Sequence, residues 1–105
     1  MQYIKPASTV YFLEAVFLEN LAFVIFYLEF SGDVNIFDIK GRNALHYLAM
    51  NDSVAILNVL LENRINIEVE ETKEKQTPLF YALKYSSFKV FKILIERNAD
   101  INHRE

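Results

Sequence analysis

Short apolar runs alternate with polar breaks along most of the chain. Near the C-terminus the apolar positions recur at three- and four-residue spacing, which predicts an amphipathic helix. These positions are Phe88, Val90, Phe91, Leu94 and Ile95. A shorter helix is predicted before it, from Pro78 to about Tyr85, because Thr77 can cap free backbone N–H groups and Pro suits the first helical position. The polar pair Ser86-Ser87 separates the two helices. The pattern therefore predicts a pair of helices.

The same arrangement occurs 34 residues earlier. Asn43 takes the capping position, a short helix is expected from Ala44 to about Met50, and a second apolar face runs from Val54 to Leu61. Three separate blocks keep this one offset, namely 43–49 with 77–83, 56–62 with 90–96, and 65–68 with 99–102. A fixed offset within the range of roughly 20–50 residues indicates a solenoid of stacked repeats.

A third copy lies upstream, where Gly32-Asp33-Val34-Asn35 stands 33 residues before the segment 65–68. The apolar run 21–28 precedes it, as apolar runs precede the other two. One helix pair cannot bury its apolar face alone, and about three stacked copies are the usual minimum. We therefore predict a single domain over residues 1–105, with repeats at about 5–37, 38–71 and 72–105.

The N-terminal apolar stretch leaves two interpretations open. From Val10 to Phe30, 17 of 21 residues are apolar, which is long enough for a membrane span. Glu14, Glu19 and Glu29 interrupt it, and acidic residues near the centre of a span cost roughly 2.5–3.5 kcal/mol each. Two buried helices are the favoured interpretation, and a membrane anchor is the alternative. The aromatic residues at helical spacing are expected in the core: Phe12, Phe17, Phe23, Phe26, Phe88 and Phe91.

These motifs resemble those of the ankyrin-repeat family. The family's helix-opening Thr-Pro-Leu-His-x-Ala pattern is similar to residues 77–82 and, more loosely, to 43–48. Its closing Gly-Ala-Asp-Val-Asn pattern is similar to 98–102 and 31–35, and its Asp-x-x-Gly turn to 38–41. The resemblance implies an all-α ankyrin-repeat solenoid of about three helix–turn–helix repeats, joined by β-turn or hairpin connectors. It also implies that His46 is a structural hydrogen-bonding group rather than a catalytic one.

Several positions depart from the family pattern. Asp52 and Ser86 replace the Gly between the paired helices, and Arg64 and Asn98 replace the Gly after the second helix. Arg is poorly suited to a left-handed backbone, so this corner is expected to be strained or built differently. The connector 69–76 is one residue longer than the others and lacks the Asp-x-x-Gly turn, so its tip geometry is expected to differ.

Composition limits the chemistry. The chain has no cysteine, which excludes disulfides, thiolate zinc sites and cysteine nucleophiles. Its two histidines, His46 and His103, are too few for a histidine-rich metal site. His46 has no Ser, Cys or acidic partner at a recognisable motif spacing. The acidic run between Glu68 and Glu74 lacks the alternating ligands and central Gly of a calcium loop and predicts an exposed charged connector. No enzyme activity, catalytic residue, metal site, cofactor or small-molecule substrate is predicted.

Charge is uneven along the chain. Residues 1–37 carry one basic and four acidic residues, a net charge of −3, and residues 38–71 carry three basic and six acidic residues, again −3. Residues 72–105 carry seven basic and four acidic residues, a net charge of +3, so the whole chain totals −3. This balance lacks the basic footprint of a nucleic-acid binder. It could instead orient a partner electrostatically, but a set of solvated charged faces is the favoured interpretation. The expected location is inside the cell, in the cytoplasm.

The resemblance implies a scaffold or adaptor that binds an unidentified protein through the turn tips and the concave face of the first helices. Apolar anchors with a polar rim are typical of such an interface. The candidate partner-binding residues are Ile39, Lys40, Arg42, Met50, Asn51, Lys73, Glu74, Gln76, Lys84 and Tyr85. The structural alternative is that Met50 packs against a neighbour and that the tips are only solvated.

The two ends suggest further possibilities. Terminal repeats normally carry a polar outer face, but the first copy is very apolar and residues 102–105 resemble the start of another turn. Continuation of the array, or end-to-end self-association, is therefore expected. The alternative is a targeting segment of a larger enzyme or of a membrane-anchored protein. Asn35 and Asn102 are candidates for the hydroxylation that the resemblance implies for closing Asn residues.

Overall fold

The computed structural model describes residues 5–30 and 32–97 of the chain. Within these ranges the secondary structure is helical, without strands, and forms three successive helix pairs. The helices are α1 (Lys5–Phe17), α2 (Leu21–Glu29), α3 (Ala44–Ala49), α4 (Val54–Glu62), α5 (Pro78–Lys84) and α6 (Phe88–Glu96). This confirms the predicted all-α array of three helix-pair repeats.

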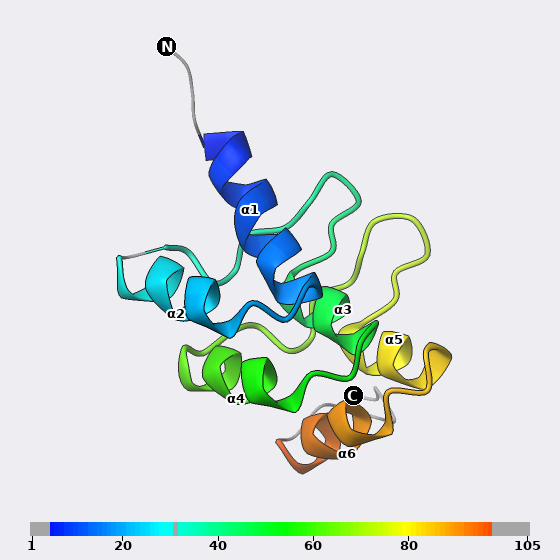
Figure 1. The fold of residues 1–105 in the computed structure, drawn as a ribbon. Coiled ribbons are helices and arrows are strands. Elements are labelled where there is room, and N and C mark those ends of the chain that lie inside the picture. Colours follow the sequence, from blue (N-terminus) through cyan, green and yellow to red (C-terminus); the bar gives the residue numbers. More distant parts are fainter. Residues whose placement is uncertain (1–4, 31, 98–105) are drawn as a thin grey trace.

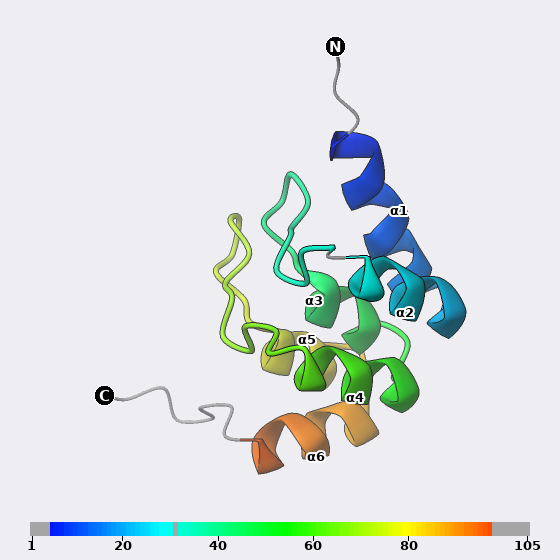
Figure 2. The ribbon, with the colours of Figure 1, turned by 90° about the vertical axis from the view of Figure 1, so that its left-hand side faces the viewer.

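The helices stack in two rows. The first helices α1, α3 and α5 contact one another in order, and the second helices α2, α4 and α6 form the other row. The two connectors, which precede α3 and α5, stand together on one side of the stack (Figures 1 and 2). Each connector ends in a tip beyond the first helices, formed by residues 38–42 in the first connector and 71–76 in the second. The candidate site lies at these tips.

The core lies between the two rows and is densest in the middle repeat. Its fully buried large side chains are Phe12, Leu45, Leu48, Ile56, Leu57, Leu60 and Leu94, together with His46, Asn43 and three valines. Each fully buried aliphatic or aromatic side chain contributes about 1.5–3 kcal/mol of transfer free energy. The middle repeat thus holds the outer two together.

The prediction that all six spaced phenylalanines lie in the core was wrong for half of them. Phe12 is fully buried, and Phe23 and Phe91 pack partly against the core. Phe17, Phe26 and Phe88 are 45%, 54% and 64% exposed. Helical spacing identifies residues that share a face, but it does not show whether a neighbouring repeat covers that face.

The predicted caps are present. The Asn43 side chain accepts hydrogen bonds from the backbone N–H groups of Leu45 and His46 at 3.0 and 3.2 Å. Thr77 Oγ1 accepts one from Phe80 N at 3.4 Å, with Pro78 at the first helical position. α6 is capped from the previous repeat, because Asp52 Oδ1 accepts from Val90 N at 3.0 Å. Capping therefore also links neighbouring repeats.

The turn between the paired helices has the same backbone form in all three repeats. Glu19, Asp52 and Ser86 have φ angles of 61°, 59° and 58°, in the left-handed region that favours glycine. Arg64 likewise has a φ of 63° at the corner after α4, so this corner keeps the left-handed form without glycine. Asn98 and the closing motif 98–102 lie outside the described residues.

The apolar stretch 10–30 is divided between α1 and α2, and the break falls at residues 18–20. Through the parts of the chain that the structure describes, no helix has both the length and the apolar character needed to cross a membrane.

Candidate partner-binding surface

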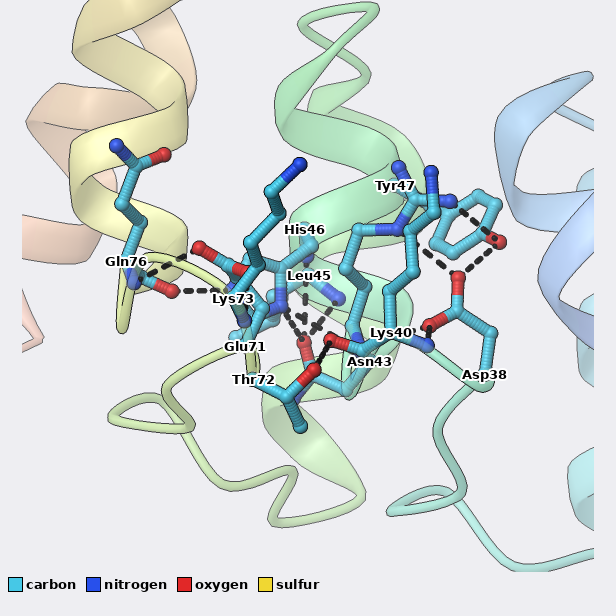
Figure 3. A network of polar contacts seen from close by, with 11 residues as sticks. Asp38, Lys40, Asn43, Leu45, His46, Tyr47, Glu71, Thr72, Lys73 and Gln76 are labelled. Atoms are coloured by element: carbon cyan, nitrogen blue, oxygen red, sulfur yellow. Dashed lines mark hydrogen bonds and ion pairs between the residues drawn. The ribbon is translucent and has the colours of Figure 1, made fainter.

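The first connector tip is built around the carboxylate of Asp38 (Figure 3). Its Oδ1 accepts hydrogen bonds from the backbone N–H groups of Lys40 and Arg42, each at 2.9 Å. Its Oδ2 accepts from Arg42 Nε at 2.9 Å and from the Tyr47 hydroxyl at 2.6 Å. Gly41 turns the chain with a φ of 79°, and a Cβ there would lie 2.8 Å from Thr72 Cγ2. The backbone angle favours glycine, and a Cβ at this position would fit only if Thr72 moved.

This network shifts the acidity of its members. Burial raises the pKa of Asp38, but the hydrogen bonds from Tyr47 and Arg42 lower it by more, so the net pKa lies below the ordinary value. Burial, followed by the hydrogen bond to Asp38, raises the pKa of Tyr47 to about 12. Asp38 therefore stays ionised and Tyr47 stays protonated near neutral pH.

The second tip uses Glu71 as the first uses Asp38. The Glu71 carboxylate accepts hydrogen bonds from the backbone N–H groups of Lys73, Glu74 and Gln76, at 3.0, 3.2 and 3.1 Å. Lys75 takes the position of glycine, with a φ of 60°. The extra residue of this connector lies within the tip and makes the turn wider. The Glu71 side chain spans this turn because it is one methylene longer than that of Asp38. The turn of the second tip thus differs from that of the first, but a carboxylate that accepts backbone hydrogen bonds holds both.

The prediction that residues 68–74 form an exposed charged connector was wrong for Glu71, which is only 4% exposed. Burial raises the pKa of its carboxyl, whereas the backbone N–H groups of Gln76, Glu74 and Lys73 lower it by more, so the net pKa lies below the ordinary value. Its oxygens are occupied by backbone donors rather than turned toward a cation. Over residues 5–30 and 32–97, no three His, Cys, Asp or Glu side chains gather in a way that could hold a metal ion.

The two tips are hydrogen-bonded to each other. Thr72 donates twice to the Lys40 carbonyl oxygen, from its backbone N–H at 2.8 Å and from its hydroxyl at 3.0 Å. Below them, Asn43 Nδ2 donates to the Asn66 carbonyl oxygen at 3.0 Å. These bonds hold the connectors side by side, and Figure 3 shows the contact between Thr72 and Lys40.

His46 lies beneath the tips and is fully buried. Its Nδ1 accepts from Asn43 N–H at 3.1 Å, which places the ring hydrogen on Nε2, 2.8 Å from the Gln76 carbonyl oxygen. Burial lowers its pKa below the ordinary value, despite the opposing hydrogen bond to Gln76 and the nearby carboxylates. The ring is therefore neutral and ties one repeat to the next, which confirms the structural role predicted for it.

Six of the ten predicted partner-binding residues are exposed. They are Ile39, Lys40, Lys73, Glu74, Lys84 and Tyr85. Ile39 is the extreme case, with 98% of its surface accessible at the end of the first tip. Exposed apolar side chains beside charged ones fit the anatomy of an interface core with a polar rim.

The other four are half-buried and have structural partners. Arg42 pairs with Asp38 and lies 5.1 Å over the Tyr47 ring. Met50 packs against the core, as the structural alternative predicted. Asn51 Nδ2 donates to the carbonyl oxygens of Val16 and Phe17, which ties α1 to the second repeat. Gln76 Nε2 donates to Glu74 Oε1 at 3.0 Å. Their contribution to binding is therefore constrained by these roles.

The structure adds residues that sequence reasoning did not select. Lys84 Nζ lies 5.8 Å from the ring of Tyr81 and 5.7 Å from the ring of Tyr85. The repeat offset places Phe17 and Leu18 in register with Met50 and Asn51, and both are exposed. The offset itself was the signal that could have found Phe17 and Leu18. We define the candidate face by the following exposed and half-exposed residues of the tips, the first helices and the turn after α1: Glu14, Phe17, Leu18, Ile39, Lys40, Arg42, Tyr47, Met50, Lys73, Glu74, Lys75, Gln76, Lys84 and Tyr85.

Paired helices stacked in two rows, with hydrogen-bonded tips beyond the first row, define a helical-repeat solenoid of the kind that presents an extended binding surface. The chain matches the ankyrin-repeat family, described as three copies of the repeat, over residues 12–105, and it belongs to that family. Ankyrin repeats are generally protein–protein interaction modules.

Two relatives illustrate the match. The chain is 31% identical over 81 residues to an ankyrin repeat protein of Rickettsia felis, which covers 76% of this chain and 27% of that protein. It is 38% identical over 75 residues to the neurogenic locus notch homolog protein 1 of Mus musculus, which covers 71% of this chain and 3% of that protein. The chain thus spans about a quarter or less of these relatives.

Proposed function

We propose that the chain is a protein-binding scaffold or adaptor that holds its partner on the candidate face. The observation that carries the proposal is the pair of tips fixed by Thr72 and Lys40, which display Ile39 at 98% exposure beside exposed lysines. A fixed apolar anchor within a charged rim favours specific contact with a protein surface. Tyr85 supplies a second apolar anchor at the end of α5.

A quantitative pull-down from cells that express the tagged chain tests this proposal. The variant carries Ile39→Asp and Tyr85→Ala, and the control carries Lys92→Ala on the second-helix row. Partners recovered with the wild type and the control should be lost with the double variant. Equal recovery in all three would contradict the assignment of the candidate face. Circular dichroism of the purified variants checks that each is folded.

A second candidate contact lies on the C-terminal side of α5. Phe80 and Leu83 are 44% and 54% exposed, whereas the equivalent His46 and Ala49 of the middle repeat are fully buried by the third repeat. We propose that this side stacks on the first repeat of another copy, where Phe26 is exposed. The opposite net charges of residues 1–37 and 72–105 support a head-to-tail contact. Continuation of the array is the alternative occupant.

Mixing two blocked variants tests the head-to-tail contact. Phe80→Glu disables one side of the stack and Phe26→Glu the other, so each variant alone should be monomeric in analytical ultracentrifugation. Their equimolar mixture should form a dimer through the two unaltered sides. A mixture that stays monomeric would contradict the contact, and a dimer formed by either variant alone would indicate a different interface.

Other sequence-based expectations stay predictions. They are the absence of catalysis, nucleic-acid, small-molecule and cofactor binding, the cytoplasmic location, and the alternative of a targeting segment in a larger or membrane-anchored protein. Asn35 Oδ1 accepts a hydrogen bond from Asn66 N at 2.8 Å. Hydroxylation of Asn35 would therefore modify a residue that is bonded to the next repeat. Asn102 lies outside the described residues, as does the terminal segment 102–105.

A further inference from the structure

Charge on the candidate face differs from charge on the chain as a whole. Across the second and third repeats the tips and first helices carry five basic side chains, Lys40, Arg42, Lys73, Lys75 and Lys84. Their acidic side chains are Asp38, Glu71 and Glu74. Five minus three leaves a net of +2 on this surface, although the chain totals −3.

Of the three acidic side chains, Asp38 and Glu71 are used within the tips and Glu74 is exposed, so more ammonium groups than carboxylates face outward. The Asp38 carboxylate accepts hydrogen bonds from the side chains of Arg42 and Tyr47 and from two backbone N–H groups. The buried Glu71 carboxylate accepts hydrogen bonds from three backbone N–H groups. Their charge is therefore satisfied locally. Lys40 and Lys73 instead extend from the tips in the same direction (Figure 3), and both are exposed. A partner approaching this surface meets cations first.

Aromatic rings lie next to these cations. Lys84 borders the rings of Tyr81 and Tyr85, and Arg42 lies over Tyr47. Each pairing sets a flat apolar area beside a positive charge. Such a surface suits a partner in which carboxylates and apolar side chains are interspersed.

The far end of the same face has a different character. On α1 and the turn after it, Glu14, Phe17 and Leu18 are exposed, and residues 11–20 contain no Lys or Arg. Register places Phe17 beside Met50, and Met50 beside Lys84. The face is therefore apolar with a carboxylate at the first repeat and cationic at the second and third.

We propose that the candidate face selects an extended acidic segment of its protein partner and fixes its direction. The carboxylate-rich part lies across Lys40, Lys73 and Lys84, and the apolar part lies toward Phe17 and Leu18. This rests on the proposed protein-binding function and adds the chemistry and polarity of the partner. A nucleic acid fits less well, because its uniform phosphate charge would run onto Glu14 and the acidic first repeat.

Selection from a peptide library tests the proposal while the partner is still unidentified. Short random peptides displayed on phage are selected against the 105-residue chain, and the recovered sequences should be enriched in Asp and Glu toward one end and in apolar residues toward the other. A synthetic copy of a recovered peptide is then measured by fluorescence polarisation. Its affinity should fall on the order of tenfold in the variant Lys73→Glu/Lys84→Glu and decrease with added salt.

The matched control is Lys89→Glu/Lys92→Glu, which makes the same change of net charge at exposed positions of α6. This control should leave the affinity within about twofold, since screening weakens charges far from the contact. A peptide with the sequence reversed should bind more weakly than the original. Equal binding by both peptides would overturn the fixed direction.

Other outcomes separate the two proposals. Peptides that lose affinity with Ile39→Asp/Tyr85→Ala but show no acidic enrichment would leave the protein-binding proposal standing and overturn this one. Peptides unaffected by either double variant would contradict both, and failure to select any peptide would count against both. Labelled polyuridine that binds as tightly as the peptide, with the same loss in Lys73→Glu/Lys84→Glu, would replace the acidic protein segment with a nucleic acid.

Discussion

At the scale of single residues, the chain substitutes side chains for the glycines and aspartates of its family while keeping their geometry. Glu71 binds the backbone of the second tip as Asp38 binds that of the first, and Lys75 adopts the left-handed backbone that Gly41 adopts. The charge of Glu71 is thus a structural requirement. Its neighbours Lys73 and Glu74 are exposed.

Removing the charge of Glu71 should destabilise the fold. Glu71→Gln keeps the size of the side chain but places an N–H₂ group against backbone donors, so the midpoint of thermal unfolding should fall. Glu62→Gln, at an exposed position near the end of α4, serves as the control and should change it little. Equal midpoints for the two variants in differential scanning calorimetry would contradict the buried role of Glu71.

The free energy of unfolding should also decrease as the pH is lowered, because His46 becomes protonated more readily in the unfolded chain. Its pKa is lowered on folding, so the unfolded chain binds a proton more readily, and stability is lost as pH decreases from the unfolded value of about 6.5. Asp38 and Glu71 have lowered pKa values as well, so their contributions are present above the unfolded value of about 4 and are lost below it. Urea unfolding between pH 7 and pH 5 should show a decline that His46→Gln removes. An unchanged slope in that variant would show that His46 is not the titrating group.

At the scale of elements, each helix pair turns through residues with left-handed backbones, and the corner after α4 relies on Arg64. A non-glycine residue in this conformation costs of the order of 1–3 kcal/mol. Glycine removes that cost but adds freedom to the unfolded chain, which offsets roughly half to one kcal/mol. The corner is therefore a place where one substitution should stabilise the fold.

Arg64→Gly should raise the free energy of unfolding by about 1 kcal/mol. Arg64→Ala is the matched control, since it removes the same side chain but keeps the Cβ and the backbone strain. The difference between the two variants in urea unfolding isolates the backbone contribution. Lower stability of the Gly variant than of the Ala variant would contradict a strained corner.

How far the elements could be predicted depended on the range of the interaction. The caps at Asn43 and Thr77 and the apolar spacing are local in sequence, and the 34-residue offset can be read directly from it. Each of these signals predicted helices that the structure contains. The bonds between Thr72 and Lys40, or between Asp52 and Val90, join residues of different repeats, and spacing alone does not specify them. The same reason explains Phe26 and Phe88, whose exposure depends on neighbouring repeats.

At the scale of the whole molecule, stability depends on the middle repeat, because among the described helices its pair packs against a repeat on either side. Leu48 and Leu57 are fully buried between the outer repeats, whereas Phe88 is exposed on the third. A stack of three copies is close to the minimum for independent folding. Damage to the middle copy should therefore unfold the whole array at once.

Leu57→Ala should cost about 2–5 kcal/mol, enough to unfold much of the population of a marginally stable domain. Phe88→Ala should change stability by about 0.5 kcal/mol or less, since its side chain is largely in water already. Far-ultraviolet circular dichroism during urea titration measures both. Comparable losses in the two variants would contradict a stability centred on the middle repeat.

The double hydrogen bond from Thr72 to the Lys40 carbonyl has a kinetic consequence. It makes Ile39, Lys40 and Lys73 parts of one preorganised body, so the entropy of ordering two loops is lost during folding and not when a partner arrives. Thr72→Ala should therefore leave the encounter rate with a partner nearly unchanged and shorten the lifetime of the complex. The fixed spacing of the tips would therefore add to the individual contacts in determining how long a partner stays bound.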